Sequence, residues 1–425
     1  MLALIQRNSA LRRIILFQLL GGLQYGAFSL LFNLYLLALG HAEDLVGIVA
    51  GVMTLALSFS ALATGRLARR WGGRRVMAGG LLLASAAAVA QSLATTAVPI
   101  VLFAALNGCG FAMLQALQMP VLADHVAPEE RPEAAALVAA VATLSITGGT
   151  LVGGVLPSLL GGTGLSMVAR DRMTLLLAAA VGALGVIPLL GLDDHGTVTR
   201  PGVGARIGAG PAEGTRLRVQ RLIRRYSLAT ALISCGAGAF LPFANVYLAR
   251  LGASAGAIGG LLGATGALGA VVGLLGPALA RRVGRERLAV MLRLAPVPAA
   301  VLLLVQPMIP LVVLTYAARQ IGGGMTWPIE ASILNDRVDA RTRAGAFGLR
   351  TAAWNLGWAL SSTVSGLLIV RGGYHYPVLI LIASTLLGAV TLSLVLRPAG
   401  EVVASAAPPT SSEHSRERAT ARHSR

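Results

Sequence analysis

The chain has 425 residues, of which 55% are hydrophobic and only 12% charged, and its mean hydropathy is +0.74. In soluble domains about a quarter of the residues are charged, so this composition excludes an ordinary soluble protein and indicates a membrane protein. The formal net charge is +18, and every basic residue is an arginine. These arginines stand in short clusters between apolar runs and form no single basic surface, which excludes nucleic acid as a partner. Both cysteines, Cys109 and Cys235, lie in apolar segments, so no disulfide framework is expected.

In chain order, the sequence contains twelve apolar runs of about the 20 residues that a membrane-spanning helix needs. The first six cover residues 14–38, 45–64, 76–96, 98–122, 134–160 and 173–191. The second six cover residues 226–249, 256–279, 288–306, 309–331, 346–369 and 376–396. We therefore expect an N-terminal six-helix bundle (1–191), a cytoplasmic linker (192–225), a C-terminal six-helix bundle (226–397) and a disordered cytoplasmic tail (398–425).

The second half of the chain repeats the first at a constant offset of 212 residues. Aligned pairs include Gly26-Ala27-Phe28 with Gly238-Ala239-Phe240, Gly40 with Gly252, and Asp124 and Arg131 with Asp336 and Arg343. Each repeat contains an even number of spans, so both face the same way across the membrane, as parallel repeats of transporters do. The expected fold is an all-α integral membrane protein, with twelve transmembrane helices in two parallel-repeat six-helix bundles around a central cavity.

The distribution of arginines predicts the orientation in the membrane. The segments before the first span, after spans two, eight and ten, and between the halves are rich in arginine, and Arg131 follows span four. The opposite side carries four arginines, namely Arg170, Arg172, Arg250 and Arg371. By the positive-inside rule both termini are expected in the cytoplasm, in a multi-pass protein of the inner or plasma membrane.

The segment between spans two and three reads Gly65-x-Leu67-Ala68-Arg69-Arg70-x-Gly72-x-Arg74-Arg75. It resembles the G-x-L-A-D-R-x-G-R-R signature of the major facilitator superfamily, whose members also have twelve spans in two halves. The resemblance implies secondary transport by alternating access, with Gly65, Arg69, Arg70, Gly72 and Arg74 at a cytoplasmic gate. One departure is that Arg69 stands where the family has an aspartate that belongs to the gate's charge network, so this network must be rearranged or absent. Alternatively, the arginines only anchor the loop and the glycines make the turn.

Polar side chains inside the spans indicate where a solute would bind. Arg319 lies near the middle of the tenth span, where an arginine facing lipid costs at least about 2.5–3.5 kcal/mol, so it should face the protein interior or water. On a helical wheel Trp327 and Glu330 share its face. The aligned residues of the fourth span form a second polar stripe, with Asn107, Gln115 and Gln118. We expect both stripes to line the cavity and bind the substrate; alternatively, Arg319 pairs structurally with a carbonyl or an Asn of another helix.

Other candidates are less specific. Glu330 is the only carboxylate inside a predicted span, which suits a proton carrier, although it lies close to the inner end. Gln24 on the first span, and Trp354 and Trp358 on the eleventh, are further substrate-binding candidates, the tryptophans by stacking on a flat solute or else by packing alone. We expect Asn33 and Asn245 to make interhelical hydrogen bonds.

The duplicated pairs Asp124 with Arg131, and Asp336 with Arg343, follow the fourth and tenth spans. They predict salt bridges or helix caps that close the cytoplasmic side, the alternative being ordinary solvation of the loops.

The sequence contains no phosphate-binding Gly-x-x-x-x-Gly-Lys loop and no His or Cys cluster with metal-ligand spacing. We therefore expect no cofactor, no metal and no enzymatic activity. The predicted function is secondary active transport of a small organic solute by a monomer in the lipid bilayer, with a slight preference for proton-coupled efflux. Uptake of an anionic metabolite attracted by Arg319 is the alternative within this class. Outside it, a polytopic protein that does not transport, such as a sensor, scramblase or embedded enzyme, stays open.

Overall fold

The computed structural model describes residues 2–192, 213–273 and 275–396. The N-terminal half contains α1 (Leu2–Arg7), α2 (Ser9–Ala38), α3 (Glu43–Trp71), α4 (Gly73–Leu93), α5 (Ala97–His125), α6 (Arg131–Leu159), η1 (Leu160–Thr163), α7 (Met167–Leu184) and α8 (Val186–Leu190). The C-terminal half contains α9 (Glu213–Phe240), η2 (Leu241–Phe243), α10 (Ala244–Arg250), α11 (Ala255–Gly273), α12 (Gly276–Val283), α13 (Arg285–Leu294), α14 (Val297–Val305), α15 (Ile309–Arg337), α16 (Ala340–Gly372) and α17 (His375–Leu396). The predicted tail (398–425) and most of the predicted linker lie outside the described residues.

These helices form the twelve predicted spans, some of them from two consecutive helices. Within the described residues, eleven segments are long and apolar enough to cross a membrane. The span that is not among them is α15, which carries both Arg319 and Glu330. The all-helical, twelve-span fold expected from the apolar runs is confirmed, and the span that falls short in hydropathy carries two buried charged residues.

Most helices begin before their apolar runs, and the early starts of α9 and α7 bring charged residues into the helices. Helix α9 starts at Glu213, so residues 213–225 of the predicted linker are helical and continue into the seventh span. Helix α7 starts at Met167, which places Asp171 inside the sixth span with only 2% of its surface exposed. Glu330 is the only carboxylate inside the predicted spans, but the observed helix of the sixth span also contains the buried Asp171. Charged residues near the start of a helix lower its local hydropathy, so the apolar run begins after them.

The backbone carries the sequence repeat. Gly40 and Gly252, one repeat apart, have φ angles of 89° and 91°, and Gly72 and Gly284 have φ angles of 85° and 92°. A positive φ is accessible to glycine at little cost, so each pair ends its helix with the same turn. The two halves thus share backbone conformation at matched positions as well as residues.

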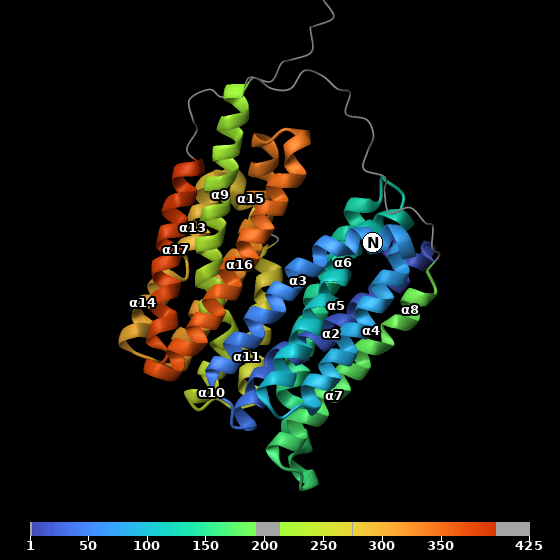
Figure 1. The fold of residues 1–425 in the computed structure, drawn as a ribbon, viewed down its shortest axis with the longest axis vertical. Helices are drawn as coiled ribbons and strands as arrows, with labels where there is room; N and C mark the ends of the chain where they lie inside the picture. The colour runs from blue at the N-terminus through green and yellow to red at the C-terminus, as the bar shows by residue number, and fades with distance from the viewer. Residues whose placement is uncertain (1, 193–212, 274, 397–425) are drawn as a thin grey trace, which may run out of the picture.

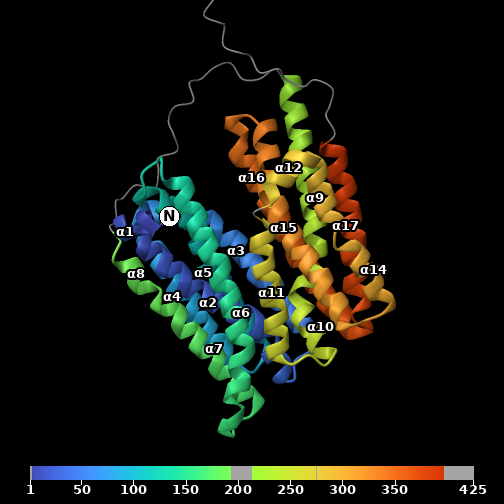
Figure 2. The same cartoon turned by 180° about the vertical axis from the view of Figure 1, so that it is seen from behind.

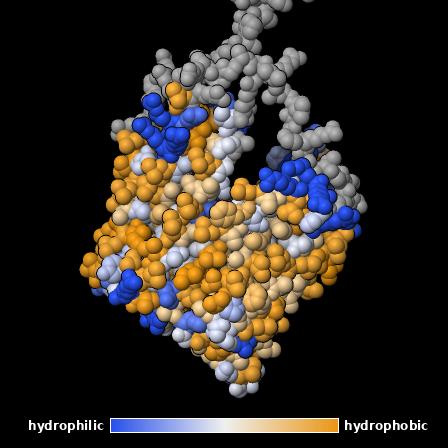
Figure 3. All heavy atoms as spheres, in the orientation of Figure 1, coloured by the Kyte–Doolittle hydropathy of each residue, from blue (hydrophilic) through white to orange (hydrophobic). Residues whose placement is uncertain are grey.

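Each half forms a bundle of its own, and the two bundles lie side by side (Figures 1 and 2). Helices α2, α4, α5, α6 and α7 pack on one another in the N-terminal half, and α9 packs on α16 and α17 in the C-terminal half. Two helix pairs join the halves, α3 with α16 and α6 with α11. We call the end that carries Arg66, Arg70 and Arg131 the arginine-rich end, and the end with turns 39–42, 251–254 and 373–374 the arginine-poor end. The space-filling view is hollowed between the two bundles at the arginine-rich end (Figure 3).

Glycines allow the helices of the two halves to approach closely. A methyl group at Gly47 of α3 would lie 2.3 Å from the carbonyl oxygen of Ser362 on α16. One at Gly154 of α6 would lie 2.6 Å from the carbonyl oxygen of Ala255 on α11. A side chain of any size at these positions would force the backbones apart, so small residues set the spacing of the halves.

Hydrogen bonds from the two aligned asparagines also join the halves. The Asn33 Nδ2 on α2 donates to the carbonyl oxygen of Pro242 at 2.8 Å, and the Asn245 Nδ2 on α10 donates to that of Leu30 at 2.6 Å. The prediction that these asparagines make interhelical hydrogen bonds is confirmed. They act at the arginine-poor end and tie the N-terminal half to the C-terminal half.

Candidate functional site

A cluster of buried charges lies inside the C-terminal half. The carboxylate of Glu330 on α15 accepts a hydrogen bond from Arg293 Nε of α13 at 2.9 Å and from Arg350 Nη2 of α16 at 3.0 Å. The side chains of these three residues are between 1% and 3% exposed. The hydroxyl of Tyr226 on α9 donates to the main-chain oxygen of Glu330 at 3.3 Å. Four helices therefore converge on one carboxylate.

Glu330 lies near the inner end of its span, where a side chain could reach water, but in the structure it is buried. Both of its carboxylate oxygens are bonded to guanidinium groups, and it is only 2% exposed. Proton uptake by Glu330 would thus require one arginine to leave. Its distance from water follows from the long arginine side chains of α13 and α16, which fill the space around it.

Arg319 belongs to the same region but makes no ion pair with Glu330. Its Nη2 donates to the carbonyl oxygen of Ile233 on α9 at 2.9 Å, while its Nε is buried and has no hydrogen-bond partner. The side chain is 4% exposed, so it faces the protein interior as the cost of an arginine in lipid required. A carbonyl partner was the structural alternative for this residue, and that contact is present.

Aromatic rings cover the arginines. The ring of Trp327 lies 3.9 Å from Arg350 Cζ, and the ring of Trp354 lies 5.9 Å from Arg319 Cζ and 6.0 Å from Arg293 Cζ. Cations within about 6 Å of an aromatic ring centre are attracted by its negative face. Trp358 stacks on Trp354 at 6.4 Å, and Trp327 is 41% exposed. The cluster is therefore walled by tryptophans, one of which reaches the molecular surface.

The polar residues predicted in the N-terminal half are dispersed. Asn107 is 2% exposed and donates to Gln91 Oε1 at 3.0 Å. Gln24 is 3% exposed and accepts a hydrogen bond from Ser85 at 3.3 Å, inside the bundle. Gln118 donates to Gln18 Oε1 at 2.7 Å, and Gln115 is exposed. Of the four, Gln115 is exposed and Gln118 partly exposed, whereas Gln24 and Asn107 are enclosed within the bundle.

Arg293 and Arg350 were not among the predicted site residues. Both lie inside predicted spans, at 288–306 and 346–369, and the argument that identified Arg319 applies to them equally. Tyr226 stands at the first position of the predicted seventh span and carried no comparable signal. The sequence therefore indicates three arginines inside spans. It does not indicate that two of them pair with Glu330.

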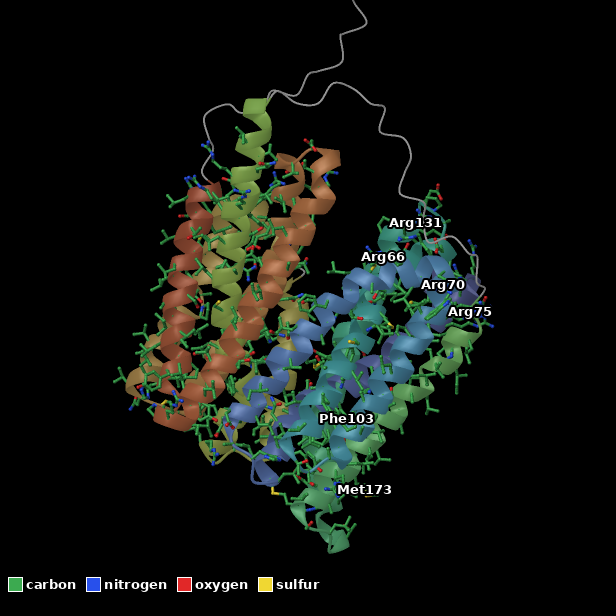
Figure 4. All side chains as sticks on the ribbon, viewed as in Figure 1. Arg66, Arg70, Arg75, Phe103, Arg131 and Met173 are labelled. Atoms are coloured by element: carbon green, nitrogen blue, oxygen red, sulfur yellow. The ribbon has the colours of Figure 1, made fainter. Side chains whose placement is uncertain are left out.

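The residues of the signature motif lie at the arginine-rich end of the N-terminal half (Figure 4). Arg69 and Arg70 are exposed at the end of α3, and Gly72 makes the positive-φ turn into α4. Arg74 donates to the carbonyl oxygens of Leu190 and Leu192 at the end of the half. A methyl group at Gly65 would meet only the side chain of Arg69, at 3.7 Å. These contacts lie within the N-terminal half, and the gate role assigned to the motif residues remains a prediction.

The aligned Arg131 and Arg343 act as helix caps at equivalent positions. Arg131 donates to the carbonyl oxygens of Ala123 and Val126, and Arg343 to those of Asn335 and Val338. Each acceptor pair is one repeat apart from the other. Asp336 pairs with Arg285 at 2.8 Å on the exposed surface, while Asp124 lies on α5 next to the first cap. Of the predicted alternatives, the arginines make caps of α5 and α15, because the last carbonyls of a helix lack partners of their own.

An ion pair joins the halves at the arginine-poor end. Glu43, at the start of α3, accepts from Arg250 Nε of α10 at 2.9 Å and from the Tyr374 hydroxyl at 3.1 Å. The ring of Tyr374 stacks on that of Tyr247 with their centres 4.2 Å apart. Burial, and then the adjacent Glu43 carboxylate, raise the pKa of Tyr374, so its hydroxyl keeps the proton that it donates.

A cavity of about 750 Å³ lies between α12 and α15, and its charged lining residues are Arg281 and Arg285. Its lining is largely small and apolar, including Gly273, Gly276, Pro277, Ala280 and Met325. Among the described residues, no group of three His, Cys, Asp or Glu side chains could hold a metal ion.

Two repeated bundles joined at one end, with an interior charge cluster, define a polytopic membrane protein of the carrier type. The sequence matches the family described as Major Facilitator Superfamily over residues 14–318 and 299–423. The chain belongs to the major facilitator superfamily and is a multi-pass transporter of small solutes, as the signature motif indicated.

Solved structures share this fold. The nucleoside transporter NupG superposes with a TM-score of 0.70 at 15% identity, covering 91% of this chain and 99% of that one. A mutant form of NupG gives a TM-score of 0.74 at 15% identity, covering 91% and 100%. A bacterial homologue of the human lysosomal transporter Spinster, inward-facing and unoccupied, gives 0.68 at 16% identity, covering 91% and 96%. No curated protein sequence matches the chain.

Proposed function

We propose that the protein is a secondary active transporter that carries a small organic solute by alternating access. The observation that carries this proposal is the arrangement of its two repeated halves. They are joined by hydrogen bonds and an ion pair at the arginine-poor end, and a hollow separates them at the arginine-rich end. Parallel-repeat carriers work by rocking such halves about a site near the bilayer midplane. By the positive-inside rule, the hollowed end faces the cytoplasm and both termini lie on that side.

Export remains our preferred direction, with proton coupling through Glu330. Support for export comes from the stretch Gly149-Thr150-x-x-Gly153-Gly154 of α6, which resembles the G-P-x-x-G-G motif of proton-coupled exporters in the superfamily. These glycines also pack α6 against α2 and α11, as a methyl group at Gly149 would lie 2.2 Å from the Leu23 carbonyl oxygen. Uptake of an anionic metabolite is the second candidate, and the surplus of buried arginines around Glu330 favours it.

The test begins with purified protein screened against metabolites and drugs for ligands that raise its melting temperature, because a ligand that favours the folded state stabilises it. A ligand found in this way is then loaded into liposomes that contain the protein. We expect gradient-driven counterflow of the labelled ligand, absent from protein-free liposomes. A ligand that stabilises the protein but shows no counterflow would contradict transport and favour a sensor.

Proton coupling has a separate test. In Glu330→Gln the residue can no longer exchange a proton, so we expect transport to lose its dependence on an imposed pH gradient. The measurement is the solute flux with and without the imposed pH gradient, in wild type and in Glu330→Gln. An unchanged pH profile in Glu330→Gln would remove this residue as the proton carrier.

A further inference from the structure

We propose that the buried arginines of the C-terminal half bind the carboxylate of an aromatic organic anion, held between Arg293 and Arg319 beside Gly323. The inference rests on the proposed function, since this anion is the transported solute, and it holds for either direction of transport.

The cluster carries more positive charge than it neutralises. Arg293, Arg319 and Arg350 contribute three positive charges and Glu330 one negative charge, which leaves a net charge of +2. Among the described residues, no other carboxylate forms a salt bridge with these arginines. Buried charges are costly unless they are paired, so the site is electrostatically incomplete and an anion would complete it.

Two guanidinium groups point toward the same small space. A methyl group at Gly323 would lie 3.6 Å from Arg319 Nη1 and 4.0 Å from Arg293 Nη1. Arg293 Nη1 is buried and has no hydrogen-bond acceptor, and neither has Arg319 Nε. A carboxylate placed over Gly323 would accept from both arginines, and hydrogen bonds between charged partners are the strong ones. The absent side chain of Gly323 is what leaves room for it.

Trp354 and its neighbours suit a flat solute. The Trp354 ring lies against both arginines of this subsite and makes an edge contact with Trp327, with centres 5.7 Å apart. Because Trp327 is 41% exposed, the aromatic wall runs from the molecular surface to the guanidinium pair. An aromatic body would pack against these rings while its carboxylate reaches the arginines.

The repeat argues against a purely structural role for the charges. At the positions aligned with Arg293, Arg350 and Glu330, the N-terminal half has Leu81, Val138 and Gln118. That half forms the same bundle with no charge at any of the three positions. The fold of the repeat therefore does not need the cluster, which points to a role in binding. Glu330 is the resident counter-ion, and a substrate carboxylate would add a second negative charge to the cluster.

The binding test uses tryptophan fluorescence of the purified full-length protein with three probes: benzoate, its neutral analogue benzamide, and acetate. Three of the four tryptophans lie at the site, and Trp71→Phe removes the remote one. We expect saturable quenching by benzoate, with affinity about tenfold or more above that of benzamide and of acetate. Equal binding of benzamide would overturn the anion site, and equal binding of acetate would overturn the aromatic requirement.

Matched variants locate the site. Gly323→Ala makes only ordinary van der Waals contacts, so it should fold, but its methyl group occupies the subsite, and we expect about tenfold weaker benzoate binding. Gly348→Ala on α16, where nothing lies within 4 Å, is the control and should bind as wild type does. If Gly323→Ala binds benzoate as tightly as wild type, the anion does not bind at Gly323 and the assignment is wrong.

Glu330→Gln distinguishes binding from a structural role. Removal of the resident carboxylate leaves three arginines without a counter-ion, so benzoate should bind about tenfold tighter than to wild type. A merely structural Glu330 predicts equal or weaker binding, and that result would overturn its counter-ion role. Arg287→Gln, an exposed arginine on the helix of Arg293, should leave the affinity unchanged.

The two proposals can fail separately. Benzoate binding without counterflow of any solute would contradict transport and leave the anion site standing. Counterflow of a neutral solute, with no preference of the protein for benzoate over benzamide, would contradict the anion site and leave transport standing.

Discussion

At the scale of single residues, the arginine-rich interior of the C-terminal half is the unusual feature. Charged side chains in a span are expensive, and here each finds its partner on a different helix of the same bundle. Glu330 on α15 bonds to Arg293 on α13 and Arg350 on α16. Arg350 in addition stacks on Trp327, 3.9 Å from the ring centre. These contacts connect α13, α15 and α16, so the charges also contribute to the stability of the bundle.

Loss of Arg350 should therefore destabilise the protein. Arg350→Gln leaves Glu330 with one of its two guanidinium partners, and breaking a buried ion pair from one side typically costs about 3–5 kcal/mol. We expect a lower melting temperature and a lower free energy of unfolding in detergent micelles. Arg287→Gln, exposed on α13, serves as the control and should unfold like wild type; an Arg350→Gln variant as stable as this control would contradict the argument.

At the scale of helices, close approach across the halves depends on glycine. Gly47 and Gly51 of α3 lie one turn apart and face Ser362, Thr363 and Ala359 of α16. Gly154 of α6 faces Ala255 and Gly259 of α11. Backbones that touch in this way separate when a side chain is added, since protein interiors are packed too densely to absorb it. These two helix pairs therefore set how firmly the arginine-poor end closes.

Gly47→Ala should open that end. Its methyl group would lie 2.3 Å from a main-chain oxygen of α16, too close for any real contact, so α3 and α16 must move apart. We expect faster labelling of a cysteine substituted at Ser362, which is fully buried, by a membrane-impermeable maleimide, in a background without the two native cysteines. Gly260→Ala on α11, with nothing within 4 Å, is the control. Equal labelling rates in the two variants would show that α3 and α16 tolerate the methyl group.

At the scale of the whole molecule, the two halves are joined at the arginine-poor end and separated at the arginine-rich end, one of the arrangements that the proposed alternating access requires. The connections at the arginine-poor end are two asparagine hydrogen bonds, the Glu43–Arg250 ion pair and the Tyr374 hydroxyl. Because the Arg250 side chain is 55% exposed, the ion pair is screened by water and contributes little to overall stability. A weak contact of this kind suits a gate that must open and close, since a conformational equilibrium within a few kcal/mol is readily shifted.

Arg250→Gln should shift the equilibrium toward opening at the arginine-poor end. It removes the charge that holds Glu43 across the halves and leaves the Tyr374 hydrogen bond in place. We expect longer distances between spin labels attached to the two halves at that end, measured by pulsed electron resonance. Arg371→Gln, another arginine of that end, provides the matched control. A distance distribution in Arg250→Gln that matches the control would exclude the ion pair as part of the gate.

Much of the architecture followed from the sequence because it depends on periodic, additive properties. Twelve apolar runs fix the number of spans, and the offset of 212 residues fixes the equivalence of the halves, down to paired glycine turns and the caps made by Arg131 and Arg343. Helix starts were less predictable, as Asp171 and residues 213–225 illustrate, because charged residues near the start of a helix lower its local hydropathy. The interhelical role of Asn33 and Asn245 was predictable from the small residues around them.

The sequence by itself determined that this chain spans a membrane twelve times, in two equivalent halves, and that Arg319 faces the interior. The spans follow from local hydropathy, the halves from the repeat register, and the direction of Arg319 from the cost of a charge in lipid. Only the tertiary structure decided that Arg293 and Arg350 pair with Glu330, with Arg319 in the same region, in the C-terminal half alone. The tertiary structure alone also showed that Gln24 and Asn107 are enclosed within the N-terminal half, and that the halves meet at the arginine-poor end. The physical reason is that a helical wheel gives the direction of a side chain but not the neighbour it meets, and packing between distant helices sets that neighbour.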